Sequence, residues 1–300
     1  MFGFAFYRQF KYKMVTHARV FSLKPKFMIS QKQGLFIVNS FHFLNKEFGY
    51  ENMCSWTKIK SKKIKLPTKN KKIDFDFMES FITELETERI SKLETYLLAS
   101  GLKDYALTAE EQKALADFES IEWKEFRIGD LFERIKTTKL SYKADELQKE
   151  PKDTYTLPCL TSSFQNQGLN YFAPKDNATI LKNVISIPSN SDVYRAYFQS
   201  REFTVLSDAY AIEWIYNDVK ISPNQYLFTV PCINKVTDLS IYSYKNKLGG
   251  WNVVKDKYIL LPIKNNHPDY KMMETLISAI QKQVIKDVVL YTDKKLNIAK

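Results

Sequence analysis

Apolar residues recur at three- and four-residue steps between Ile73 and Leu98, and charged residues occupy most of the positions between them. This spacing places one apolar stripe on a charged helix. Asp74 or Asp76 can cap the start of the helix, and Gly101 stands just past its end. The pattern therefore predicts one long amphipathic helix over this stretch.

The same pattern occurs a second time near the end of the chain. Met78 falls on Met273 and Trp56 falls on Trp251, a shift of 195 residues in both cases. With three gaps the match extends back to the first residues of the chain. The sequence is therefore interpreted as an internal duplication in which each copy ends in a long helix. About 70 residues of the second copy, from Trp123 to roughly Asp192, have no counterpart in the first.

Short apolar runs bounded by Asn, Asp, Ser, Gly and Pro predict β strands between the two helices. Residues 1 to about 67 are predicted to be β-rich with one or two short helices, because large apolar residues there mostly alternate with smaller or polar ones. A capping box from Thr108 to Glu111 predicts a short helix after the first long one. The strands predicted in the second copy are residues 125–128, 157–161, 184–187, 203–205, 210–215 and 258–261.

Composition allows two modest domains with packed cores, since the chain has 300 residues and 44% of them are apolar. Lysine and arginine total 45 against 34 acidic residues, a formal charge of +11 that favours a polyanion such as nucleic acid. A generally basic proteome would give the same excess. Cys54, Cys159 and Cys232 lie far apart and indicate reduced thiols. No apolar run reaches the roughly 18 residues of a spanning helix, so a cytoplasmic protein without membrane contact is expected.

Sequence motifs for catalysis are missing. The chain has no phosphate-binding loop, no glycine-rich dinucleotide turn and no methyltransferase motif for holding a target base. His17, His42 and His267 are scattered without metal-ligand spacing. Asp192 and Asp208 form a conceivable carboxylate pair, but His17 replaces Asp208 in the first copy. A non-catalytic binding protein is therefore expected, with no metal or cofactor in this chain.

Two copies of one module suit a ligand with two separated half-sites, as duplex DNA offers. Amide side chains can pair with base edges, hydroxyls with bases or phosphates, and cationic groups with phosphates. For each candidate the alternative interpretation is an ordinary solvated loop residue. The candidate DNA-binding residues of the second copy are Lys136, Lys139, Lys143, Thr161, Ser162, Ser163, Gln165, Asn166, Gln167, Asn190, Ser191, Tyr194, Arg195 and Arg201. Those of the first copy are Arg8, Lys11, His17 and Arg19.

Two matching stretches carry a resemblance to a known family. They are FGYENMCSWTKIKSKKIKLPTKNKKIDFDFMESFI and YSYKNKLGGWNVVKDKYILLPIKNNHPDYKMMETLI. Both contain an aromatic-x-aromatic-x-Asn turn, a basic strand closing in Leu-Pro and an Asp-aromatic-x-x-Met helix start. In this order the features resemble a target-recognition domain running into its spacer helix in the specificity (S) subunits of type I restriction–modification systems. WKEFRIGDLFE, residues 123–133, resembles the opening of such a domain.

The resemblance implies a definite architecture and set of partners. Each recognition domain reads one half of a bipartite double-stranded DNA target, and two spacer helices pack antiparallel as a coiled coil. The spacer docks methyltransferase (M) subunits, which bind S-adenosylmethionine, and a restriction motor-nuclease (R) subunit joins for cleavage. The residues expected to pack in the spacer are Phe81, Leu85 and Leu97 on one helix and Ile277, Ile280, Val284 and Val288 on the other.

The expected fold class is α+β, with tandem mixed α/β target-recognition domains separated by two long antiparallel spacer helices. The expected function is sequence-specific DNA recognition for a type I restriction–modification complex. Two alternatives stay open, namely the C-terminal recognition part of a fused restriction–methylation enzyme and a truncated S-like regulatory or decoy protein. The expected domains are a truncated first recognition domain over 1–72, a central spacer helix over 73–100, a linker with a short helix over 101–122, a second recognition domain over 123–266 and a distal spacer helix over 267–298.

Overall fold

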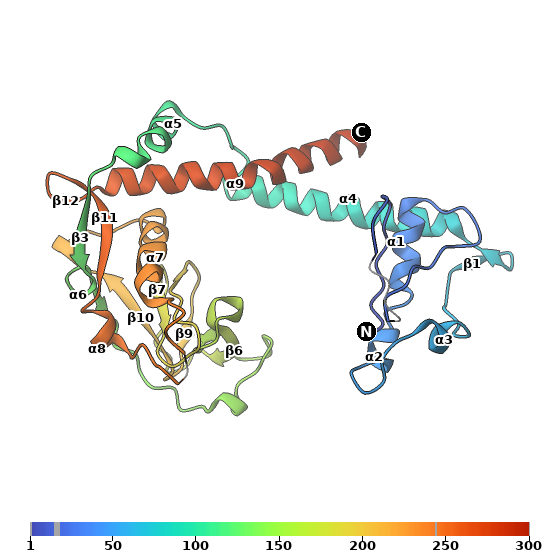
Figure 1. Cartoon of the computed structure of the whole chain (residues 1–300), viewed down its shortest axis with the longest axis horizontal. Helices are drawn as coiled ribbons and strands as arrows, with labels where there is room; N and C mark the ends of the chain where they lie inside the picture. Colours follow the sequence, from blue (N-terminus) through green and yellow to red (C-terminus); the bar gives the residue numbers. More distant parts are fainter. Residues whose placement is uncertain (1, 15–18, 244, 300) are drawn as a thin grey trace. The chain divides into compact units, whose positions relative to one another are not determined.

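The computed structural model describes residues 2–14, 19–243 and 245–299. The chain divides into two compact units, which we describe separately (Figure 1). Unit 1 comprises Met1–Lys103 with Lys286–Lys300, and unit 2 comprises Asp104–Ile285. The last helix, α9 (Tyr270–Ala299), begins in unit 2 and ends in unit 1. None of the helices in the described parts of the chain combines the length and apolar content needed to span a membrane.

Unit 1 is a small globule that leads into a long helix. Its compact core contains Leu44, Phe48, Cys54 and Ile59, all buried. The tight hairpin before the long helix turns at Asn70 and Lys71, which both have positive φ. The elements of unit 1 are α1 (Gln31–Asn39), α2 (Leu44–Glu47), α3 (Trp56–Ile59), β1 (Thr68–Lys69), β2 (Lys72–Ile73), α4 (Phe75–Ala99) and the end of α9.

The prediction of β-rich structure in residues 1–67 is wrong. The described part of this range contains three short helices and no strand. Phe4, Phe6 and Phe10 are instead 63%, 69% and 63% exposed. In the second copy the matching residues include β8 and β10, which pair with β7, and β10 also pairs with β4. These 300 residues hold no first-copy counterpart of β4 or β7, so the alternating segment has no neighbouring strand to pair with.

Unit 2 contains most of the strands. A four-stranded antiparallel sheet has the order β4-β10-β7-β8, and two three-stranded sheets have the orders β12-β11-β3 and β6-β5-β9. Only the β5–β9 pair is parallel among the described strands. The strands of unit 2 are β3 (Trp123–Arg127), β4 (Phe132–Arg134), β5 (Tyr155–Leu160), β6 (Leu169–Pro174), β7 (Val184–Pro188), β8 (Tyr197–Gln199), β9 (Thr204–Val205), β10 (Ala209–Trp214), β11 (Tyr258–Lys264) and β12 (His267–Pro268). Its helices are α5 (Ala109–Ala116), α6 (Ile128–Leu131), α7 (Pro223–Thr237), α8 (Trp251–Val254) and the start of α9, with short 3-10 helices at 118–120, 144–146, 165–168 and 216–218.

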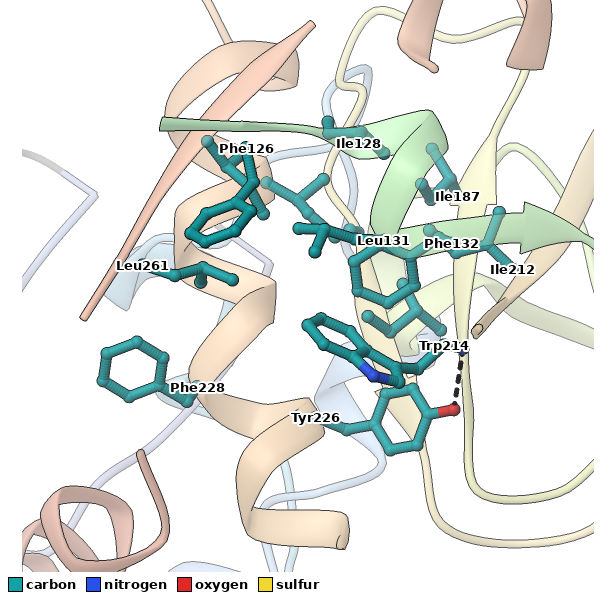
Figure 2. Close-up of a cluster of buried hydrophobic side chains, with 14 of the residues drawn as sticks. Phe126, Ile128, Leu131, Phe132, Ile187, Ile212, Trp214, Tyr226, Phe228 and Leu261 are labelled. Atoms are coloured by element: carbon teal, nitrogen blue, oxygen red, sulfur yellow. Dashed lines mark hydrogen bonds between the residues drawn. The ribbon is translucent and has the colours of Figure 1, made fainter. Parts of the chain in front are cut away.

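The core of unit 2 forms where α7 lies against β7, β8 and β11 (Figure 1). Figure 2 shows Phe132, Trp214 and Tyr226 gathered in this core. The Phe132 and Trp214 rings meet edge to face at 5.1 Å. The backbone N–H of Trp214 donates a 3.1 Å hydrogen bond to the Tyr226 hydroxyl, which satisfies this buried polar group. The core therefore joins the four-stranded sheet and β11 to α7.

Each long helix starts with the same set of hydrogen bonds. The N–H of Asp74 donates to the Pro67 carbonyl at 2.9 Å, and the N–H of Asp269 donates to the Pro262 carbonyl at 2.8 Å. The Asp74 carboxylate then caps α4 by accepting from the Phe77 N–H at 2.9 Å. Asp269 accepts in the same way from the third residue after it, also at 2.9 Å. The duplication therefore extends to individual hydrogen bonds.

A capping serine ties each long helix to a shorter helix of its own unit. Ser30 and Gln33 form a capping box at the start of α1, and Ser222 and Gln225 form one at the start of α7. The Ser30 hydroxyl also donates to Glu79 on α4. The Ser222 hydroxyl donates likewise to the matching glutamate on α9, Glu274.

The α5 helix is held against α9 by a buried carboxylate. Glu111 is 5% exposed and accepts hydrogen bonds from the Ser278 hydroxyl at 2.6 Å, the Thr108 N–H at 2.8 Å and the Lys282 ammonium group at 3.0 Å. Burial alone would raise the pKa of Glu111 above its ordinary value of 4.5. The three donors together outweigh burial and lower the pKa to about 2. The charged form of Glu111 is therefore part of the folded state.

We expect Ser30→Ala to destabilise unit 1 and Ser222→Ala to destabilise unit 2, each by about 1–2 kcal/mol, because each removes an N-cap and a hydrogen bond to the long helix. Urea unfolding of the full chain measures the loss, and hydrogen exchange assigns it to α1 or α7. Ser200→Ala, at an exposed loop position, is the control. Equal stability of all three variants would contradict the shared role of the two serines.

The folding free energy of unit 2 should depend on pH through Glu111. Its folded pKa lies below the unfolded value of 4.5, so its stabilising contribution is complete above about pH 5 and is lost as the pH falls towards about 2. Glu111→Gln should flatten this part of a plot of unfolding free energy against pH. Glu119→Gln, at an exposed carboxylate, should leave the plot unchanged. An unaltered pH dependence in Glu111→Gln would show that the carboxylate is not held in this way.

Candidate nucleic-acid interface

The turn between β5 and β6 displays three consecutive amide residues of unit 2. Gln165, Asn166 and Gln167 are exposed. Asn166 and Gln167 have φ values of 47° and 56°, and Gly168 follows with a φ of 91°. A Cβ atom at Gly168 would come within 3.2 Å of the Thr161 carbonyl oxygen, so the glycine permits a close approach of the two sides of the turn. The left-handed backbone turns the chain sharply and carries the amide groups on its outer side.

The turn is held through its backbone and leaves these amide groups unused. Strand β8 supplies two donors, the Tyr197 hydroxyl to the Phe164 carbonyl and the Gln199 amide to the Gln167 carbonyl, both at 3.1 Å. The Ser162 N–H donates to the Asp208 carboxylate at 3.1 Å. Within the described residues, the side-chain amides of residues 165–167 have no hydrogen-bond partner, so they are available to an external ligand.

A hollow of about 430 Å³ lies beside this turn. Its lining includes Asn170, whose amide donates to the Thr161 hydroxyl at 3.1 Å. The Asn190 side-chain oxygen is buried and has no hydrogen-bond partner among the described residues. The hollow therefore combines fixed polar groups with unsatisfied ones. Its lining residues are Ser162, Ser163, Phe164, Gln165, Asn170, Asn190, Ser191 and Asp192.

Three of the predicted DNA-binding residues are buried in unit 2. Tyr194 is 1% exposed and belongs to the main core. Thr161 is also buried, and its hydroxyl accepts from the N–H of Ser163 as well as from Asn170. The Ser191 hydroxyl is engaged by a neighbouring backbone N–H. Of these three residues only Ser191 lines the hollow, and all three are buried.

The cationic candidates of unit 2 differ in their partners. Arg195 is exposed, but its guanidinium group bonds to the Asp238 carboxylate at 2.7 and 2.8 Å, and this hydrogen bond raises the pKa of Arg195. Arg201, Lys136, Lys139 and Lys143 are exposed and have no ion pair among the described residues. Residues 136–143 are anchored on β5 and β6 through the buried side chain of Leu140.

The candidates of the first copy belong to unit 1. Lys11 is exposed, and the Arg8 guanidinium group lies 5.4 Å from the centre of the Phe6 ring. Arg19 is half-buried. His17 lies outside the described residues. Unit 1 contains no counterpart of the turn at 165–168 within its described part.

The predicted spacer residues fall into two groups. Leu97 is buried within unit 1, and Ile277 is half-buried against the core of unit 2. Phe81 and Leu85 on α4 are exposed, and so are Ile280, Val284 and Val288 on α9. Phe81 also makes ring contacts with Phe36 and Phe77 in unit 1. Both long helices therefore keep apolar side chains available on their surfaces.

Sequence reasoning missed two residues that line the hollow and one that holds the turn beside it. Phe164 is exposed within the polar turn, Asn170 lies on β6 and Asp208 fixes the turn from the start of β10. Asn170 and Phe164 stand inside the polar stretch already identified, so closer attention to that stretch would have found them. Asp208 lies 46 residues from its partner Ser162, and no sequence signal joins the two. In the described residues, no group of three or more His, Cys, Asp or Glu could hold a metal ion.

Comparison with known proteins gives a family match and several relatives. The model for "Type I restriction modification DNA specificity domain" matches residues 1–95 and 120–290. The chain is 24% identical over 284 residues to the specificity subunit S.BcgI of the type II restriction enzyme BgcI from Heyndrickxia coagulans. That alignment covers 92% of this chain and 74% of the relative.

Solved structures give weaker likenesses. The S subunit of a type I restriction-modification system from M. genitalium aligns with a TM-score of 0.48 and 15% identity, covering 88% of this chain and 68% of that one. A chain from a study of complex assembly and conformational transition of the type I R-M system aligns with a TM-score of 0.40 and 13% identity. That alignment covers 88% of this chain and 66% of the other.

The family match spans both copies of the duplication and most of each long helix. It covers far more than half of the 300 residues. The chain therefore belongs to the family of type I restriction-modification DNA specificity domains.

Proposed function

We propose that unit 2 reads one half of a bipartite DNA target through the turn at residues 165–167 and the hollow beside it. Members of the family are non-catalytic specificity subunits of restriction-modification systems. The observation that carries the proposal is the set of three exposed, unpaired amide groups on a backbone fixed by Tyr197, Gln199 and Asp208. A side-chain amide pairs with the adenine edge through two hydrogen bonds, and a fixed backbone limits the entropy lost on binding.

The partners of this chain are double-stranded DNA, methyltransferase subunits and a motor-nuclease subunit. The methyltransferase subunits bind S-adenosylmethionine and supply the chemistry, while this chain selects the sequence. A relative that is itself a specificity subunit of a restriction enzyme supports this division. The cytoplasm, where DNA is accessible, is the proposed location.

The two long helices act as spacer helices in an antiparallel coiled coil and dock the methyltransferase subunits. Ile280, Val284 and Val288 recur at four-residue steps along α9, and all three are exposed. Phe81 and Leu85 form a similar stripe on α4. Exposed apolar stripes at helical spacing suit a partner helix, because docking removes apolar surface from water.

The first test changes the amide groups and keeps the left-handed turn. Gln165→Ala combined with Asn166→Gly and Gln167→Gly should relax one half of the methylated motif in cells that carry this chain and its methyltransferase. Each bidentate contact contributes about 1–3 kcal/mol of discrimination, so wrong bases should gain roughly 5- to 150-fold in methylation. Methylome sequencing measures the motif.

The matched control is Gln148→Ala with Asn177→Gly and Asn217→Gly. These residues are exposed elsewhere in unit 2, and the two asparagines also have left-handed backbones, with φ values of 59° and 53°. The control should leave the motif unchanged. An unchanged motif in the first variant would remove the turn from the recognition surface. A stable methyltransferase complex that methylates no motif would favour the decoy alternative.

The second test concerns the spacer helices. Leu85→Asp together with Ile280→Asp should abolish co-purification with the methyltransferase, because it places two charges on apolar docking surfaces. Both positions are partly exposed, so the chain should keep its thermal unfolding temperature. Ser91→Asp with Gln283→Asp adds the same charge at exposed polar positions of the same helices and should assemble normally. Normal assembly of the first pair would rule out docking through these stripes.

A further inference from the structure

The positive charge of the chain is concentrated before the first long helix. Residues 1–72 contain 16 lysines and arginines and only two acidic residues, Glu47 and Glu51. Their formal charge is therefore +14, against +11 for the whole chain, and residues 73–300 together carry −3. The polar hollow of unit 2 lies outside this basic segment.

Eight lysines of this segment lie between residues 58 and 72. Lys62 pairs with Glu47, and Lys58 donates to the Asn52 side chain and the Met53 carbonyl. The other six are exposed and have no ion pair or side-chain hydrogen bond within the described residues. We call this group the lysine strip. It consists of Lys60, Lys63, Lys65, Lys69, Lys71 and Lys72.

The second copy shows that folding does not require four of the six lysines, because only Lys60 and Lys69 match lysines there, Lys255 and Lys264. Lys63 and Lys65 match Tyr258 and Leu260, which are exposed in unit 2 as the lysines are in unit 1. Lys72 matches His267. The equivalent hairpin β11–β12 forms with a similar turn. Unit 2 therefore builds the same hairpin turn with fewer charges, although Tyr258 and Leu260 lie in β11 while residues 62–67 form no strand. The four lysines without a charged counterpart need another explanation.

The hairpin turn gives independent support. Lys71 has a φ of 61°, while the matching residue of the second copy is Asn266, with a φ of 66°. Asparagine adopts the left-handed region more readily than lysine does. A lysine at this position therefore costs conformational energy, and its side chain has no ion pair or hydrogen bond with the described residues that would offset this cost. Figure 1 shows β1 of this hairpin just before the start of α4.

We propose that the lysine strip binds the phosphate backbone of duplex DNA without regard to sequence. This inference rests on the proposed function, because it assigns affinity to unit 1 and base selection to unit 2. Lysine is a flexible point charge that suits phosphates rather than base edges. Phosphate contacts position a protein on DNA and supply affinity, but they carry no direct sequence information.

The experiment measures binding of the full chain to a 30-base-pair duplex of arbitrary sequence at several salt concentrations. Each neutralised phosphate contributes about −0.9 to the slope of log affinity against log salt. Lys60→Gln with Lys63→Gln, Lys65→Gln and Lys69→Gln should therefore reduce the slope by roughly 3–4. The corresponding Lys→Arg variant should keep the wild-type slope.

A matched control separates this effect from net charge. Lys149, Lys220, Lys245 and Lys286 are exposed and lie outside the strip, so changing all four to Gln removes the same charge. The control should keep most of the slope. Equal slopes in the wild type and the strip variant would overturn the inference, as would equal losses in strip and control variants.

The two experiments together distinguish a failure of this inference from a failure of the proposed function. A defined methylated motif together with an unchanged slope in the strip variant would exclude the lysine strip and leave recognition by unit 2 intact. A lysine-dependent slope without any methylated motif would support the strip and overturn base recognition by unit 2.

Discussion

The hydrogen bond between a capping serine and a glutamate of a long helix is the constraint on which both units depend. The serine hydroxyl accepts from the first turn of the shorter helix and donates to the glutamate, so one side chain fixes two helices. Ser30 with Glu79 and Ser222 with Glu274 perform this role. The aspartate that starts each long helix, Asp74 or Asp269, precedes this glutamate by five residues and is itself bonded to the carbonyl of Pro67 or Pro262. The direction in which each long helix leaves the globule of its own unit is therefore set by polar contacts that the duplication preserved, while the surrounding apolar residues changed.

The sequence pattern predicted an element correctly where the formation of that element depends only on its own residues. The long helices and the short helix capped by Thr108 follow from apolar spacing and from caps, and both features lie within the segment itself. The prediction of β structure at residues 4–14 was wrong because a strand needs a neighbouring strand to pair with, and alternation of side chains does not provide one. Helix α7 was missed because Pro231 stands in its interior, although its capping box was visible in the sequence. The conformation of the turn at 165–168 was beyond sequence reasoning, since glutamine has no preference for a left-handed backbone. The burial of Tyr194 depends on residues far along the chain.

The two copies share a scaffold and differ in surface chemistry. Unit 2 presents amides and hydroxyls around a hollow that includes an aspartate, and the binding proposed there would depend on hydrogen-bond geometry. The matching scaffold of unit 1 presents uncompensated lysines, and their interaction with an anion is long-ranged and sensitive to salt. In the proposed function, one copy selects the ligand and the other attracts it. A single module would have to place cations next to the groups that discriminate, where nonspecific attraction weakens discrimination.

The exposed aromatic residues near the start of the chain also affect how the protein behaves at high concentration. Within its described part, the segment that carries the exposed rings of Phe4, Phe6 and Phe10 belongs to no strand, and such a segment is a template for pairing with another chain, which leads to aggregation. Arg8, Lys11 and Lys13 interrupt this segment, and charges in such positions oppose the stacking of identical chains. Their repulsion weakens as ionic strength rises. High salt therefore weakens the repulsion that opposes self-association of this segment, and the colloidal stability of the protein should fall as the ionic strength rises.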